Sequence, residues 1–225
     1  MKIRTLHLQT SRFHENKDFY TKCFGLELSE QTDDVFSGKI GWSILKFEKS
    51  IRSCLYHYCF LISPNLLEQA LAWMEQRVDI IKLEGEEKII DFKDWNAKSF
   101  YFYDGSGNLA EFIAHGDFDD SCHQDFNMSK VLGINEIGIG TDNVQRINRS
   151  LEENCQTKFW KGDLDRFGTN GSAEGRFIIA NYNKKETWFP TEIKITPVPL
   201  EVEIENKNQL YKLKYIDGNF KKAGM

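Results

Sequence analysis

The chain has 225 residues, of which 40% are hydrophobic, and 17 of them are Phe. This composition provides a substantial apolar core, and the length lies between that of one large domain and that of two small ones. The formal net charge of −5 argues against nucleic acid as a partner, because nucleic-acid-binding surfaces concentrate Lys and Arg. No segment approaches about 20 apolar residues, and the start lacks a signal-peptide core, so we expect a cytoplasmic protein with no membrane partner.

The five cysteines are odd in number and scattered, and no two form a C-x-x-C pair. This spacing predicts neither a disulfide framework nor a zinc knuckle. We expect each cysteine to act as a small buried apolar residue in a reducing compartment.

The first of three similar segments begins with an alternating strand at residues 6–10. A helix near residues 14–24 follows, and Gly25 is suited to end it. A strand-like run at residues 39–47 completes this first unit.

The second segment repeats the order, with a strand at residues 58–62 and a helix over residues 65–77. Pro64 lies where the first turn of this helix would begin. Strand-like runs at residues 99–103 and 109–114 follow.

The third segment starts with a strand at residues 134–140, and Asp142 is a suitable N-cap for a helix over residues 143–154. Runs at residues 176–180 and 200–204 read as its later strands. Repetition of one βαβββ unit predicts an α+β fold, since each small sheet has an apolar face that a neighbouring unit must cover.

Three residues on the predicted strands are of the types that one metal ion binds, namely His7, His57 and Glu111. Two imidazoles and one carboxylate form a facial ligand set that leaves positions open for substrate. Glu111 is the most informative of them, because a carboxylate between Ala110 and Phe112 is costly to bury unless a cation or a partner accompanies it.

Side chains on a strand alternate between faces, so Ser99 and Tyr101 share one face with Trp95, while Phe100 and Phe102 take the other. Hydroxyl groups beside a metal ligand are typical of a cavity lining, whereas the Phe face suits helix packing. We therefore expect Trp95, Ser99 and Tyr101 to bind substrate.

Other residues complete the predicted site. Gln9 lies close to His7 in sequence, and Trp42 can line an apolar cavity, so both are expected to bind substrate. Tyr101 and Glu111 are the predicted catalytic residues, and His115 is a second proton-transfer candidate that we expect to be exposed to solvent.

Residues 1–116 resemble the vicinal oxygen chelate superfamily, which includes glyoxalase I, extradiol dioxygenases, and fosfomycin- and bleomycin-resistance proteins. The resemblance implies that paired βαβββ units curl mostly antiparallel sheets around a cavity. It also implies that the metal ligands come from the first strand of each unit and the last strand of the second, where His7, His57 and Glu111 stand. The segments that carry it are Leu6-His7-Leu8, Asp18-Phe19-Tyr20, Phe24-Gly25-Leu26, Tyr56-His57-Tyr58-Cys59-Phe60 and residues 99–111.

The resemblance implies a metal-dependent enzyme that acts on a small oxygen-bearing molecule. The metal would stabilise an oxyanion or enolate, in a lyase, an isomerase or a ring-cleaving dioxygenase. The ligand types suit Fe, Mn, Ni or Zn, with Fe or Mn preferred. A metal-free binding protein of the bleomycin-resistance kind is the alternative, and a structural partner protein without a cavity function is a third. A fosfomycin-type enzyme is disfavoured, because few cations flank the site.

The chain divides, on this interpretation, into residues 1–116 with the metal site, a linker at 117–130, and a third unit with a tail at 131–225. A second, all-carboxylate site at Glu136, Glu201 and Glu203 is one interpretation of the third unit, but a sheet with one hydrated face explains the same alternation. We expect the third unit to support a homodimer or to cover the first pair of units, with Trp188-Phe189-Pro190 as a contact.

Overall fold

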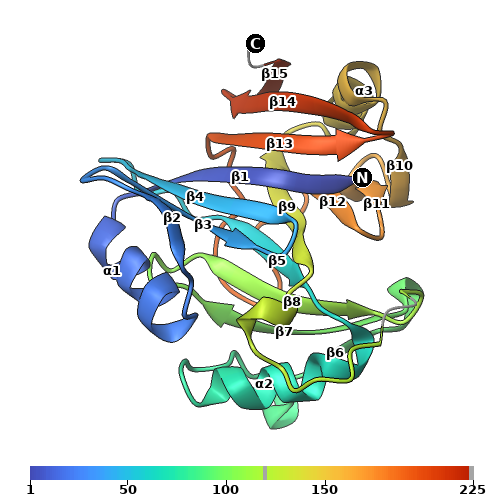
Figure 1. The fold of residues 1–225 in the computed structure, drawn as a ribbon. Helices are drawn as coiled ribbons and strands as arrows, with labels where there is room; N and C mark the ends of the chain where they lie inside the picture. Colours follow the sequence, from blue (N-terminus) through green and yellow to red (C-terminus); the bar gives the residue numbers. More distant parts are fainter. Residues whose placement is uncertain (119–120, 223–225) are drawn as a thin grey trace.

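Two mixed β-sheets form the body of the protein (Figure 1). The computed structural model describes residues 1–118 and 121–222. No helix in these two ranges is both long enough and apolar enough to cross a bilayer. The α-helices are α1 (Phe13–Asp18), α2 (Leu67–Glu75) and α3 (Val144–Cys155), with a π-helical turn at Phe19–Cys23 and 3₁₀ turns at Pro64–Leu66, Glu84–Glu86, Lys93–Trp95 and Met128–Lys130.

The first sheet has seven strands in the order β15-β14-β13-β1-β4-β3-β2. Strand β1 lies inside it, antiparallel to β13 on one side and parallel to β4 on the other. The sheet therefore joins the start of the chain to its last strands. The bounds are β1 (Lys2–Thr10), β2 (Leu28–Gln31), β3 (Val35–Ile40), β4 (Ser43–Lys49), β13 (Leu200–Asn206), β14 (Gln209–Ile216) and β15 (Asn219–Lys222).

The second sheet has eight strands in the order β10-β11-β12-β9-β5-β8-β7-β6. Strand β5 lies near its middle, antiparallel to β9 and parallel to β8. The bounds are β5 (His57–Leu61), β6 (Ile90–Phe92), β7 (Ala97–Tyr103), β8 (Leu109–His115), β9 (Gly133–Thr141), β10 (Phe159–Gly162), β11 (Phe167–Ser172) and β12 (Gly175–Asn181).

The predicted βαβββ order is confirmed, because β1–β4 with α1, β5–β8 with α2, and β9–β12 with α3 each follow it. The run at residues 200–204, predicted as a strand of the third unit, is instead β13 and lies beside β1 in the first sheet. Strands β13–β15 form a fourth, shorter group without a helix. The expected pairing of the first two units is not the one observed: the first unit pairs with the fourth group, and the second pairs with the third. The sheets therefore cross the predicted domain limits of 1–116 and 131–225, and Asp119 and Asp120 of the predicted linker lie outside the described residues.

The two faces of the second sheet have different roles. Phe100, Phe102 and Phe112 point into the main core, where Phe102 packs against Phe19 of the π-helical turn and Phe112 packs against Phe24, which follows that turn. Glu111 and Tyr101 lie on the opposite face, as the alternation of β7 and β8 predicts. All residues of β5, β8 and β9 are buried, because both faces of the sheet are covered, as is common for inner strands.

Helix α3 begins at a cap different from the predicted Asp142. The side chain of Asn143 accepts a hydrogen bond from the Arg146 N–H at 2.9 Å, while Asp142 forms an exposed ion pair with the Arg146 guanidinium at 2.6 Å. We expect Asn143→Ala to lower the free energy of unfolding by about 1 kcal/mol. Asp142→Ala should lower it by about 0.5 kcal/mol or less, because exposed ion pairs contribute little. Urea denaturation measures both values, and a larger loss in Asp142→Ala would contradict this assignment.

Candidate metal centre

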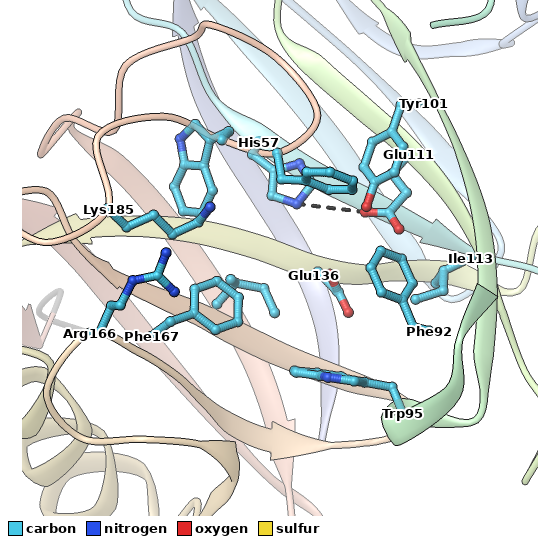
Figure 2. Close-up of a pocket in the computed structure, with 13 residues that line it drawn as sticks. His57, Phe92, Trp95, Tyr101, Glu111, Ile113, Glu136, Arg166, Phe167 and Lys185 are labelled. Atoms are coloured by element: carbon cyan, nitrogen blue, oxygen red, sulfur yellow. Dashed lines mark ion pairs between the residues drawn. The ribbon is translucent and has the colours of Figure 1, made fainter. Parts of the chain in front are cut away.

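A cavity of about 260 Å³ lies on the face of the second sheet that is turned away from the main core (Figure 2). The polar side chains of His57, Glu111 and Glu136 meet inside it. Its size suits a small ligand, and aromatic walls with a few convergent polar groups are typical of binding sites. The aromatic lining consists of Phe92, Trp95, Tyr101, Phe167, Trp188 and Phe189.

His57, Glu111 and Glu136 come from three adjacent strands, β5, β8 and β9. Each offers one ligand atom, and these atoms all lie within 4.8 Å of one another. His57 Nε2 lies 3.6 Å from Glu111 Oε2. All three side chains are buried, and theirs is the one such group of His, Cys, Asp or Glu found in residues 1–118 and 121–222.

Strand register explains why these residues meet. Cys59 on β5 pairs with Glu111 on one side and with Glu136 on the other. His57 lies two residues before Cys59 and therefore points to the same face of the sheet. The three side chains thus converge on one spot from the middle of the sheet, where the backbone is most constrained.

A hydrogen bond to the backbone orients the His57 ring. Its Nδ1 lies 3.2 Å from the carbonyl oxygen of Leu109. Because a carbonyl can only accept, Nδ1 carries the proton and Nε2 presents its lone pair to the cavity. Burial lowers the pKa of His57 to about 4, so the ring is neutral at neutral pH. A neutral imidazole held through its other nitrogen is the usual form of a metal-binding histidine.

The two carboxyl groups are costly to keep charged at this depth. Burial raises the pKa of Glu111 well above its ordinary value, and the charge of Glu136 raises it further. Burial also raises the pKa of Glu136, while the charge of Arg176 acts in the opposite direction. A divalent cation would offset both penalties. One imidazole and two carboxylates in a buried cluster therefore fit a divalent transition metal with open coordination positions.

A buried cation lies behind Glu136. The side chain of Arg176 is fully buried, and its Nε lies 3.0 Å from Glu136 Oε1. Its Nη2 donates to Asn135 Oδ1 at 2.7 Å, and the guanidinium lies 4.3 Å from the centre of the Trp160 ring. Arg176 thus fixes the orientation of Glu136 and balances part of the negative charge.

His115 is part of the same network, which corrects the expectation that it is exposed to solvent. It is buried and contacts the Arg176 guanidinium through Nε2. Burial, followed by the charge of Arg176, lowers the pKa of His115 to about 4. His115 therefore lies behind the cavity, and it is absent from the side chains that line it.

Two of the predicted substrate-binding residues, Trp95 and Tyr101, line the cavity. Burial and the nearby charge of Glu111 raise the pKa of the Tyr101 hydroxyl well above its ordinary value, so this group keeps its proton and is a hydrogen-bond donor. Ser99 is buried on the same strand face, and its hydroxyl beside Glu111 favours the charged carboxylate.

The structure does not bring His7 to His57 and Glu111, and Glu136 takes the third position instead. His7 belongs to β1 in the first sheet, where its Nε2 lies 3.3 Å from Glu48 Oε2. Gln9 lines the same small hollow as His7, away from the main cavity. Trp42 packs against Gly133 and is likewise absent from the cavity lining.

The first sheet carries a partial copy of the cluster. Glu48 pairs with Gln9, two residues after His7, as Glu111 pairs with Cys59, two residues after His57. Glu201 pairs directly with His7 on the other side.

The copy differs from the cluster of the second sheet in its charge balance. Glu201 forms an ion pair with Lys214 at 2.5 Å, and about half of the Glu48 and Glu201 side chains is exposed. Lysine and water therefore compensate these carboxylates. The interpretation of Glu136, Glu201 and Glu203 as one site is not supported by the strand order, since Glu136 belongs to the other sheet.

The segment after β12 supplies cavity residues that the sequence did not assign to the site. Trp188, predicted as a contact of the third unit with a dimer mate or with the first pair of units, packs with its ring centre 5.2 Å from that of His57. Arg166 and Lys185 also line the cavity. The sequence could have identified Glu136 by the argument used for Glu111, because Glu136 also lies within a strand of mostly apolar residues. No local sequence pattern identifies Trp188, Arg166 or Lys185 as cavity residues.

Among known proteins, this chain resembles others in its three-dimensional structure and not in its sequence. The sequence matches no protein-family model, and no curated protein matches it. A Bacillus subtilis protein with a provisional dioxygenase assignment is 15% identical and has a TM-score of 0.57, with 80% of this chain and 64% of that chain covered. Glyoxalase I from Zea mays is 11% identical and has a TM-score of 0.52, with 79% and 66% covered.

The chain thus spans about two thirds of the length of these two proteins. At such low identity the likeness concerns the fold, and it agrees with the repeated βαβββ units and the cavity on a curved sheet. The chain has the same glyoxalase-like α+β fold as these two proteins.

Proposed function

We propose that the chain is a metal-dependent enzyme of the glyoxalase or dioxygenase type, with His57, Glu111 and Glu136 as the metal ligands. The observation that supports this most strongly is the buried group of three ligand atoms within 4.8 Å of one another inside a cavity. The ligand types suit Fe, Mn, Ni or Zn, and Fe or Mn remains our preference. The substrate would be a small oxygen-bearing molecule.

When bound, the metal supplies Lewis-acid charge that stabilises an oxyanion or enolate. The residues of the chain have separate tasks. Tyr101 keeps its proton and donates a hydrogen bond to an oxygen of the substrate. Trp95 and Trp188 hold a planar or apolar part of the substrate and exclude water. Arg176 keeps the Glu136 carboxylate in place.

A metal-free binding protein is the second candidate, and the aromatic lining of the cavity favours it. Trp95, Trp188 and Phe189 offer flat apolar surfaces that suit a planar ligand without any chemistry. In such a protein the raised pKa of Glu111 would leave it a neutral hydrogen-bond donor. Ligand binding that is indifferent to metal and to His57→Ala would favour this candidate.

The direct test compares matched histidine variants of the two sheets. We expect the wild-type protein to bind one divalent ion per chain, His57→Ala to lose it, and His7→Ala to keep it, because His7 lies in the other sheet. Elemental analysis after reconstitution with Fe, Mn, Ni or Zn measures this. Metal loss in His7→Ala but not in His57→Ala, or no metal in the wild type, would refute the site. Turnover of glyoxalase-type and ring-cleavage substrates then distinguishes the reaction types.

Homodimer formation and a cytoplasmic location remain predictions from the sequence. Sedimentation of the purified protein tests the first of them.

A further inference from the structure

Two cations reach into the cavity from the side opposite Phe92, Trp95 and Ile113 (Figure 2). They are Arg166, which comes just before β11, and Lys185, which follows β12. Glu136 lies between the two sides in this view. A ligand in the cavity would therefore contact aromatic side chains on one side and two positive charges on the other, with Glu136 between them.

Neither cation forms a close ion pair with a carboxylate in the described residues, although Asp163 accepts a hydrogen bond from the backbone N–H of Arg166 and the charge of Arg166 lowers the pKa of Asp163. Over residues 1–118 and 121–222, no carboxylate oxygen forms an ion pair with the Lys185 ammonium or the Arg166 guanidinium within 4.0 Å. The neighbouring Lys184, by contrast, forms an ion pair with Asp165 at 2.5 Å. Arg166 donates through Nε only to the carbonyl oxygen of Lys184, at 3.3 Å.

Lys185 is the more informative of the two, because it is half-buried. Burial and the charge of Arg166 both lower its pKa, and no acidic group raises it. Its charge also lowers the pKa of His57. Lys185 therefore lines the cavity close enough to His57 to act on the ring.

The backbone around both cations is fixed by one residue, Asn181, at the end of β12. Its N–H donates to the carbonyl oxygen of Arg166 at 2.9 Å, and its own carbonyl oxygen accepts from the N–H of Lys185 at 2.8 Å. Its side chain donates to the carbonyl oxygen of Asp165 and accepts from the N–H of Asn183. Asn181 thus holds the backbone of both residues in place, which orders the part of the cavity wall that carries the half-buried Lys185 and the exposed Arg166.

We propose that Lys185 and Arg166 form an anion subsite and that the ligand of this cavity is a small aromatic carboxylate. Its ring lies between the aromatic walls, its carboxylate contacts Lys185 and Arg166, and its other end faces His57, Glu111 and Glu136. Charge-assisted hydrogen bonds to a carboxylate are among the stronger polar contacts in a partly buried site. This inference rests on the proposed function, because it concerns the substrate of the same cavity.

The test uses phenylacetate and its neutral analogue phenylacetamide as probes, with titration calorimetry on the full chain. We expect the wild-type protein to bind phenylacetate more tightly than phenylacetamide. Lys185→Met should weaken phenylacetate binding about tenfold, the size of one charge-assisted hydrogen bond, and leave phenylacetamide unchanged. Lys184→Met is the matched control and should change neither. Lys185→Gln repeats the test with a polar side chain in case the Met variant folds poorly.

Equal affinity for the two probes, the same effect of Lys184→Met and Lys185→Met, or no binding of phenylacetate at millimolar concentration would each overturn the proposal. Repeating the titration in His57→Ala separates it from the proposed function. A preference for the carboxylate that persists there, and still depends on Lys185, supports the subsite even if the protein binds no metal. A preference that disappears in His57→Ala would mean that the carboxylate binds the metal, and this would refute the subsite.

Discussion

Glu111→Gln is expected to weaken binding of a divalent metal by at least about 100-fold while the protein stays folded. Loss of a residue that only orients a ligand costs about 10–100-fold, and loss of a ligand should cost more. Glutamine has nearly the same shape, and the wild-type carboxyl group tends to be protonated in the metal-free protein because burial raises its pKa. The substitution should therefore change the free energy of unfolding of the metal-free protein only slightly. Isothermal titration with Mn²⁺ or Zn²⁺ measures the change in metal affinity.

The pH dependence of Glu111→Gln provides an independent check. The metal-free wild type retains a proton on Glu111 that the unfolded chain releases above its ordinary value of 4.5. The contribution of this proton to the free energy of unfolding is therefore fully present below pH 4.5. It is lost as the pH rises through the raised pKa of Glu111 in the folded protein. Metal binding displaces the same proton, so affinity should rise with pH over that range. Both trends should weaken in Glu111→Gln.

Glu48→Gln is the control for this variant. Glu48 occupies the matching position in the first sheet and is about half exposed, so its replacement should leave metal affinity within about twofold of the wild type, as expected for a residue outside the site. Equal losses of metal affinity in Glu111→Gln and Glu48→Gln would show that the metal does not bind specifically at the cluster of the second sheet.

Arg176→Met is expected to lower the free energy of unfolding by about 3–5 kcal/mol in the presence of a chelator. Removal of one partner from a buried ion pair leaves the other charge without compensation, and such changes are strongly destabilising. Arg176 is fully buried, pairs with Glu136 at 3.0 Å and packs on the Trp160 ring. Methionine replaces some of the packing but not the charge. Urea denaturation followed by Trp fluorescence measures the loss.

Two further variants identify the cause of that loss. Arg176→Met with Glu136→Gln removes both charges and should recover a large part of the stability, since neutral groups at the same place cost less to bury. Arg146→Met breaks an exposed pair with Asp142 and should cost less than about 1 kcal/mol. If the loss in Arg176→Met is no greater than in Arg146→Met, the buried pair does not stabilise the protein as argued.

Local patterns in the sequence were sufficient to predict the repeating unit and the faces of its strands. Alternation on β7 and β8 placed Phe100 and Phe102 on the core face and Tyr101 and Glu111 on the other, because strand geometry fixes this over a few residues. The cost of burying a carboxylate identified Glu111 as a site residue by the same kind of local reasoning.

The choice between His7 and Glu136 depended on pairing between units, which no local pattern records. His7 and His57 stand at equivalent positions of β1 and β5, and each has a glutamate at the matching position of the strand beside it. The two sites are therefore indistinguishable within their own units. The difference lies in the third strand of each site: β5 pairs with β9, whose Glu136 is buried, whereas β1 pairs with β13, whose Glu201 is about half exposed and forms an ion pair with Lys214.

The fourth group of strands was not recognised as a group: the run at residues 200–204 was predicted as a strand but assigned to the third unit, whereas it is β13 of the first sheet. Strands β13–β15 have no helix, so the order of elements that defined the other units does not occur there. The segment that brings Lys185 and Trp188 over the second sheet is irregular, and its course depends on contacts such as that between Trp188 and His57. Such contacts join residues far apart in sequence, and periodicity carries no information about them.

The first sheet is complete only when β1 pairs with β13, and these two strands are separated by most of the chain. The second sheet, by comparison, is assembled from one continuous stretch between β5 and β12. Loop-closure entropy makes distant pairings slow, and high contact order lowers folding rates. During synthesis the second sheet can therefore form before β13 has left the ribosome, while β1 still offers an unpaired edge, the kind of edge that promotes association between incomplete chains.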